Sequence, residues 1–180
     1  MNAAGNGAGP IGGRHDFDFI FGGWKVRNRK LRDAAGPERE EWIEFDTAAI
    51  AQPVLGGLGH FERTWSDERS ADGPWEDFTF RQFDPARRLW SIWRATSNAP
   101  GRFGPPLTGR FADGVGTFTG ADTIAGRPVK VRFEWVNPAP RRARWTQAFS
   151  FDAGRSWNVV WIKQLIQISR RKPSDHRAGC

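Results

Sequence analysis

Apolar and polar residues alternate along most of the chain with the period of two that is typical of β-strands. In the segment 129–135, for example, apolar residues occupy the odd positions, and Lys130, Arg132 and Glu134 occupy the even ones. Alternation of this kind predicts strands with one apolar face and one polar face. We expect strands over Trp24–Leu31, Trp42–Ile50, Leu58–Trp65, Phe78–Phe83, Leu89–Ala95, Leu107–Phe111, Val115–Asp122, Pro128–Trp135, Arg144–Phe151 and Val159–Ile168.

The connections between these runs are short and rich in turn-forming residues, such as Asp84-Pro85 and Asp113-Gly114. No segment of helical period and length interrupts the series, which excludes a parallel α/β fold, because its strands need crossover helices. A sandwich or a barrel remains. Successive short hairpins favour an all-β, antiparallel up-and-down meander barrel of about 8–10 strands, which has no exposed sheet edges. A barrel of this size can have a ligand-sized interior.

Length and composition indicate a single domain with an aromatic core. The chain has 180 residues, of which ten are Trp and fourteen are Phe, and it has no Tyr. Large rings are therefore its main packing material. We expect a disordered leader over 1–14, one β-barrel domain over 15–171 and a flexible basic tail over 172–180. Before the first strand, we expect a short helical plug that presents Phe17, Ile20 and Phe21 inward.

The sequence predicts a cytoplasmic protein without a membrane segment. The leader lacks the apolar region of a secretory signal, and no stretch approaches the roughly 20 apolar residues that a membrane-spanning helix needs. Cys180 is the only cysteine. A disulfide within the chain and a thiolate metal cluster are therefore excluded.

Charge and histidine spacing argue against nucleic-acid and metal partners. The formal net charge is +7, of which the segment 169–180 contributes +3. In the rest of the chain, Arg residues are interleaved with Asp and Glu, and no basic stripe marks a nucleic-acid interface. His15, His60 and His176 share no metal-ligand spacing. We expect no metal and no cofactor, since a haem would need His60 as its axial ligand.

Five segments carry a family resemblance: HDFDFIFGGWKV at 15–26, PVLGGLGHFE at 53–62, FDPARRLWSI at 83–92, LTGRFADGVGTFTG at 107–120 and RARWTQAFSFDAGRSW at 142–157. Over about 15–165, the chain resembles an uncharacterised bacterial family of calycin-like proteins with lipocalin-like barrels. The resemblance implies a calycin barrel with a ligand cavity, but no particular reaction. It also implies that Trp24, after Gly22-Gly23, packs at the closed end of the barrel beneath a C-terminal Arg, for which Arg170 is the candidate.

Polar residues within apolar runs are the candidates for chemistry. His60 and Glu62 are two residues apart and share a strand face. They lie on the surface if Phe61 faces the core; otherwise they line the cavity mouth, where the His would act as a general base with a raised pKa. Arg81 points outward, or it faces Trp93 across a hairpin inside the barrel and binds an anionic ligand oxygen.

The last two strands contain two further candidates. Gln147 shares an apolar face with Trp145 and Phe149, so it either bridges backbone groups or points into a cavity. Lys163 shares the odd-numbered face of the last strand with Trp161. In the resembling family an apolar residue is usual at this position, and a desolvated lysine there would be reactive.

Both faces of the final strand are largely apolar, which is unusual for a strand with one side in water. One face lines the barrel, and the other must be covered by something else. A second subunit would cover it, so we expect a homodimer.

These observations favour a small-molecule binding protein that holds one apolar or aromatic ligand inside a Trp/Phe-lined barrel. Trp93, Trp145, Phe149 and Trp161 would line the cavity, and Arg81, Gln147 and Lys163 would be its polar points. The alternative is a cofactor-independent isomerase, cyclase or hydratase in the same cavity. In that case His60 and Glu62 would transfer protons and Arg81 would stabilise an oxyanion. A structural dimer without a ligand is the third possibility.

Overall fold

The computed structural model describes residues 12–36, 40–66 and 74–169. Arg170, the tail over 172–180 and most of the predicted leader lie outside these ranges. The described strands are β1 (Gly22–Leu31), β2 (Trp42–Val54), β3 (Gly59–Trp65), β4 (Glu76–Asp84), β5 (Leu89–Thr96), β6 (Leu107–Ala112), β7 (Val115–Ile124), β8 (Arg127–Ala139), β9 (Arg142–Ser150) and β10 (Asn158–Ser169). They coincide with the ten predicted runs to within a few residues at their ends.

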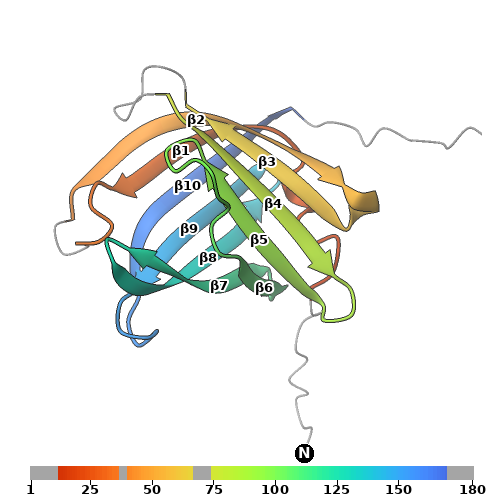
Figure 1. The fold of residues 1–180 in the computed structure, drawn as a ribbon. Coiled ribbons are helices and arrows are strands. Elements are labelled where there is room, and N and C mark those ends of the chain that lie inside the picture. The colour runs from red at the N-terminus through yellow and green to blue at the C-terminus, as the bar shows by residue number, and fades with distance from the viewer. Residues whose placement is uncertain (1–11, 37–39, 67–73, 170–180) are drawn as a thin grey trace, which may run out of the picture.

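The ten strands form one closed antiparallel barrel (Figure 1). Each strand pairs with the next along the chain, and β10 pairs with β1 to close the ring. Closure leaves no unpaired sheet edge. The predicted all-β meander barrel is therefore confirmed, and it is consistent with the calycin-like architecture that the resemblance implied. No helix in the described ranges is long and apolar enough to cross a membrane.

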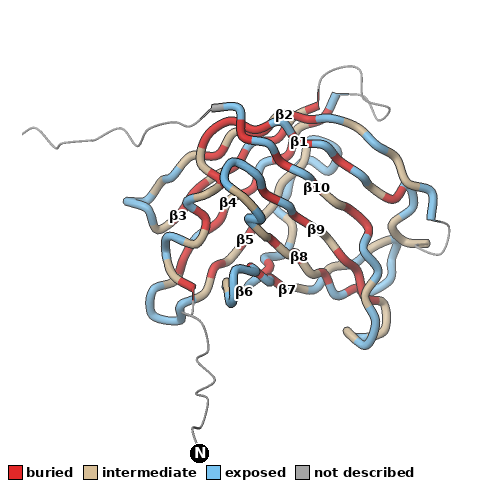
Figure 2. Tube along the Cα trace, turned by 180° about the vertical axis from the view of Figure 1, so that it is seen from behind, coloured by how far each residue is buried: buried red, intermediate tan, exposed pale blue. Residues whose placement is uncertain are grey.

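Alternation along each strand separates the interior from the outer surface, as the buried and exposed stretches in Figure 2 show. On β8, the apolar residues at 129, 131, 133 and 135 are all buried. The tight hairpins follow from local turn chemistry. Asp113 and Gly114 both have positive φ, at 50° and 79°, and Ala125 and Gly126 have 48° and 76°. Two successive positive φ angles define the type I′ turn, whose twist matches that of the flanking strands.

The predicted plug is the single-turn 3-10 helix η1 (Asp18–Ile20) with its flanking residues. Phe17 and Ile20 have no exposed surface, and the Phe17 ring lies 5.1 Å from that of Trp90 and 5.6 Å from that of Phe118. Trp24 is 1% exposed, and its indole N–H donates to the carbonyl of Ile20 over 2.6 Å. We call this the plug end of the barrel.

The opposite end, which we call the far end, contains the β3–β4 and β9–β10 connections. Three rings close the interior there: Phe45, Trp75 and Trp161, with centroids 6.2–6.4 Å apart. Trp75 and Trp161 are buried, and Phe45 is half-buried. The Nζ of Lys30 lies 4.7 Å from the centroid of the Trp161 ring. Both ends of the barrel are thus filled by aromatic side chains.

Candidate functional site

The middle of the barrel interior contains an unusual number of polar side chains, which come mainly from three neighbouring strands. Inward positions alternate along β3, β4 and β5, and the register places them side by side. The buried polar or charged residues that these three strands and β10 place in the middle of the barrel are His60, Glu62, Thr64, Asp77, Thr79, Arg81 and Lys163, with the half-buried Arg94 beside them. Gln167 of β10 is also buried, but at the plug end, where it donates to the carbonyl of Phe21. Charged residues are almost never fully buried unless they are paired, so each needs an account of its partners.

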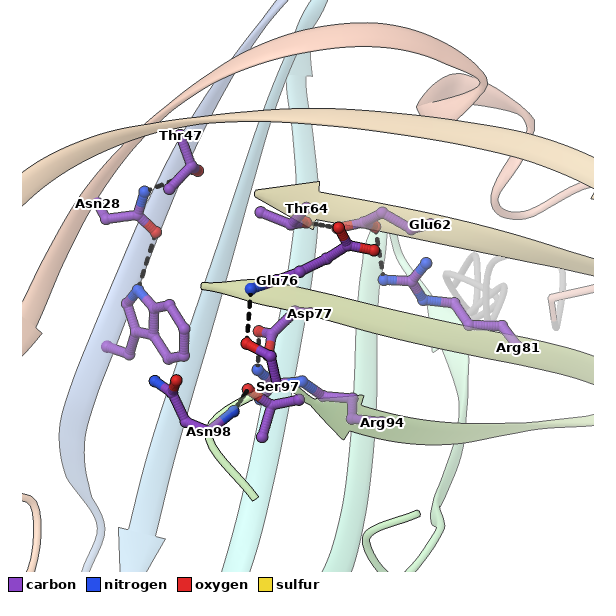
Figure 3. A network of polar contacts seen from close by, with 12 residues as sticks. Asn28, Thr47, Glu62, Thr64, Glu76, Asp77, Arg81, Arg94, Ser97 and Asn98 are labelled. Carbon is purple, nitrogen blue, oxygen red and sulfur yellow. Dashed lines mark hydrogen bonds and ion pairs between the residues drawn. The ribbon is translucent and has the colours of Figure 1, made fainter. Parts of the chain in front are cut away.

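Arg81 and Glu62 form a buried ion pair between β4 and β3. The guanidinium donates to the Glu62 carboxylate over 2.9 Å, and the side chains are 3% and 5% exposed. Thr64 donates to the other carboxylate oxygen over 3.1 Å, so that Glu62 lies between Thr64 and Arg81 (Figure 3). Burial alone would raise the pKa of Glu62. The charges of Arg81 and Lys163, with these two hydrogen bonds, hold that pKa below its usual value.

A second ion pair joins Asp77 of β4 to Arg94 of β5 (Figure 3). The Arg94 guanidinium also lies 5.4 Å from the centroid of the Trp161 ring and 5.8 Å from that of Trp145. Burial opposes ionisation of Asp77, but the charges of Arg94 and Lys163 outweigh it and lower the pKa of the carboxyl. Asp77 is therefore an anion at neutral pH.

Lys163 adds a third cation to these two pairs. Its Nζ lies 4.7 Å from the centroid of the Trp161 ring and 5.1 Å from that of Trp145, and it forms no ion pair within the described part of the chain. Burial lowers the pKa of Lys163 to about 8, although Asp77 and Glu62 oppose the shift. Below pH 8 the cluster therefore has three cations and two carboxylates, which leaves one positive charge uncompensated.

His60 has a different environment from the one predicted. It has no exposed surface, and the rings of Phe17, Phe21 and Trp90 lie 5.0–5.5 Å from its imidazole. Its Nε2 lies 3.2 Å from a nitrogen of Arg81. Because a guanidinium can only donate, Nε2 accepts and the proton resides on Nδ1, which has no partner within the described residues.

The direction of the pKa shift predicted for His60 is wrong. Burial and the charge of Arg81 lower the pKa of His60 well below its ordinary value, whereas a raised pKa was expected. His60 and Glu62 do share the inward face of β3, but each contacts Arg81 and they do not bond to each other. Phe61 points outward and stacks on Phe78, with ring centroids 5.9 Å apart.

A small cavity lies at the centre of the cluster. Its volume is about 10 Å³, and its lining comprises Glu62, Thr79, Arg81, Ile92, Arg94, Phe133, Trp135, Trp145 and Lys163. This is room for one water molecule, far less than the predicted ligand-sized interior, because side chains fill the barrel. Among the residues that the structure describes, the Nε of Arg81 and the indole N–H of Trp135 have no hydrogen-bond partner. The cavity is thus lined by more donors than acceptors.

Four of the other predicted site residues face the barrel interior, and the fifth, Trp93, faces outward. Trp145 lines the cavity, and the indole N–H of Trp161 donates to Asn28 Oδ1 over 3.0 Å. Phe149 is buried nearer the far end. Gln147 is half-buried on the same inward face, between Phe133 and Trp161 in the register, and its buried Oε1 has no partner in the described part of the chain.

Trp93 is on the wrong side of the wall for the predicted role. The register of β4 and β5 pairs Arg81 with Ile92, and it pairs Phe80 with Trp93. Trp93 therefore stacks on Phe80 on the outer surface, with ring centroids 5.9 Å apart. The expected contact between Arg81 and Trp93 inside the barrel does not form, because neighbours along a strand point to opposite faces.

Two charged members of the cluster, Asp77 and Arg94, were not predicted. Arg94 could have been found by the signal that identified Gln147, a polar residue on an otherwise apolar face, because it follows Trp90 and Ile92 at intervals of two. Asp77 shares its face with Thr79 and Arg81, so that signal would not have found it.

Comparisons with known proteins leave the family open, because no protein-family model and no curated protein matches the chain. The resemblance to calycin-like proteins therefore stays a prediction. Within the described ranges, no group of three or more His, Cys, Asp or Glu side chains is placed to hold a metal ion.

Proposed function

We propose that the barrel binds one small apolar or aromatic molecule that carries an anionic oxygen, such as a carboxylate or a phenolate. The observation that carries this proposal is the uncompensated charge of Lys163 beside a cavity lined by unpartnered donors. An unpaired buried charge is costly. An anionic oxygen in the cavity would neutralise Lys163 and accept hydrogen bonds from Arg81 and Trp135.

The rest of the ligand would lie between the cavity and the far end. Successive rings lead in that direction, with Trp145 5.5 Å from Trp161 and Trp161 6.2 Å from Trp75. The ligand's apolar part would separate these rings and replace their contacts with its own. Gln147 lies beside this route, and its unpartnered Oε1 would accept a hydrogen bond from a ligand donor.

The same geometry favours binding over proton transfer by His60 and Glu62. His60 does not line the cavity, and burial and the charge of Arg81 lower its pKa, which weakens it as a general base. Glu62 is held by Arg81 and Thr64. We therefore assign these residues to positioning Arg81.

The proposal is tested by titrating the protein with 2-naphthoate and with its neutral isostere 2-naphthamide while Trp fluorescence is recorded. We expect naphthoate to bind at least about tenfold more tightly, since one charge-assisted contact contributes roughly 1.5–3 kcal/mol. Lys163→Met removes this preference. Lys130→Met, which neutralises an exposed lysine of β8, serves as the matched control and leaves it unchanged.

The pH dependence provides a second readout. Because the bound anion favours protonated Lys163, its affinity falls as pH rises above about 8, where the amine of the unliganded protein loses its proton. The Lys163→Met variant shows no such decline. Equal binding of naphthoate and naphthamide at pH 7, or no binding of either, would contradict the proposal.

A further inference from the structure

The outer surface of the barrel has a groove that is independent of the interior site. It crosses β9, β10, β1 and β2, on the side of the molecule that Figure 2 faces, and its volume is about 790 Å³. The registers align its outward residues in two rows across the strands. One row is Arg144, Gln164, Arg27 and Asp46, and the other is Arg142, Ile166, Lys25, Ala48 and Trp65.

The groove is strongly basic. Lys25, Arg27, Arg142 and Arg144 line it, and Asp46 is the only carboxylate residue among the described residues of its lining. Arg27 forms an exposed ion pair with Glu44. Within the described residues, the other three cations form no ion pair. Several positive charges thus remain for a partner to neutralise.

The charges have a definite arrangement around an apolar centre. Ile166 of β10 is 49% exposed, and the cations lie on the two neighbouring strands, β9 and β1. Adjacent strands are about 4.8 Å apart, so the two basic strands are separated by about 10 Å. A complementary ligand has anionic groups at about this separation with an apolar group between them.

We propose that this groove binds an acidic peptide segment of a partner protein, in which carboxylate side chains flank an apolar side chain that packs on Ile166. A volume of about 790 Å³ can accommodate several side chains of such a segment. The closed barrel offers no strand edge for main-chain pairing. Recognition is therefore carried by side chains, through charge and through contact with Ile166 and Trp65.

The arrangement is less suited to other occupants. A second copy related by a two-fold axis would place the same basic residues against each other, because such an interface is made by the same patch on both subunits. A membrane surface is flat and would not fill a hollow groove. A nucleic-acid backbone would leave the exposed Ile166 without an apolar partner.

The test uses the full-length protein and fluorescence anisotropy of a fluorescein-labelled nine-residue peptide in which Glu and Leu alternate. Two control peptides replace every Glu by Lys or every Leu by Ser. We expect the Glu/Leu peptide to bind, the Lys peptide not to bind and the Ser peptide to bind more weakly. Raising the salt from about 50 mM to about 500 mM should weaken binding, because exposed charges are screened.

Matched variants locate the site. Arg144→Glu should weaken binding of the Glu/Leu peptide at least about tenfold, as expected for charge reversal within a complementary interface. Arg110→Glu makes the same change at an exposed position of β6, outside the groove, and should leave binding unchanged. Ile166→Ser should produce a loss smaller than that of Arg144→Glu.

Three results would overturn the proposal. The first is no binding of the Glu/Leu peptide, or equal losses in the Arg144 and Arg110 variants. The second is sedimentation of the protein as a dimer that Ile166→Ser or Arg144→Glu converts to monomers, because a second copy would then cover the groove. The third is binding of oligo(dT) or of phosphatidylserine vesicles that Arg144→Glu abolishes, with higher affinity than that of the peptide.

Discussion

The plug end and the middle of the barrel are both buried, yet they are built from different chemistry. At the plug end, Phe17, Ile20 and Trp24 pack together, and the indole N–H of Trp24 has a backbone partner. In the middle, ionised side chains lie among the rings of Phe133, Trp135 and Trp145, and polar atoms of Arg81 and Trp135 lack partners within the described residues.

We therefore expect the plug end to contribute to the stability of the fold and the charged middle to contribute to the proposed ligand binding. Packed rings with satisfied polar groups stabilise the fold through apolar burial. A buried charge cluster with one cation in excess adds little net stability, because the desolvation of ions offsets their attraction. The proposed ligand would compensate the excess charge of this cluster, and the following predictions test the contrast from the largest expected effect to the smallest.

Trp24→Ala should lower the free energy of unfolding by about 5 kcal/mol, since it empties the volume of a large buried ring and removes a hydrogen bond. Chemical denaturation monitored by far-UV circular dichroism measures the loss. A variant that melts within a degree or two of the wild type would show that the plug end does not depend on Trp24.

Glu62→Leu should destabilise the protein by about 3–4 kcal/mol, because it leaves the guanidinium of Arg81 buried without its anion. The double variant Glu62→Leu/Arg81→Met removes both charges and should recover most of that loss. If the double variant is no more stable than the single one, the pair contributes through specific packing, and the contrast with the plug end fails.

Lys163→Met should raise the free energy of unfolding at pH 7 by about 3–4 kcal/mol, because a pKa shift costs about 1.4 kcal/mol per unit. The folded-state pKa of about 8 lies below the value of 10.5 for an unperturbed lysine. The unfolded chain therefore binds this proton more tightly, and the wild type gains stability as pH rises through that window. The advantage of the variant should shrink from pH 8 upward and disappear above pH 10.5. A variant less stable than the wild type at pH 7 would contradict the argument.

Trp93→Ala should cost only about 1 kcal/mol, since it removes one half-buried aromatic stack on the outer surface. It should also leave naphthoate binding unchanged, because Trp93 does not line the cavity. A loss of naphthoate affinity in this variant would contradict this assignment and would support the sequence-based prediction that Trp93 lines the ligand cavity.

The sequence by itself determined the strands, their antiparallel order and the plug. These features depend on local chemistry: period-two alternation identifies strands such as β8, and dipeptides such as Asp113-Gly114 impose the turns between them. Burial of Phe17 and Ile20 also follows locally, because apolar residues next to a first strand have only the barrel interior to occupy. The polar residues Gln147 and Lys163 stood out for the same reason, since each interrupts an apolar face.

Only the tertiary structure decided which polar groups meet and how much space they leave. Arg81 faces inward and Trp93 outward because the closed ring sets one register for all strands, and a shift of one residue would exchange the two faces. Lys163 lies on β10, far along the chain from Asp77 and Arg94 on the β4–β5 hairpin, so the charge balance that they share depends on the closed barrel. The pKa of His60 was predicted in the wrong direction for the same reason: its neighbours along the chain include a carboxylate, but its neighbours in space are rings and a guanidinium.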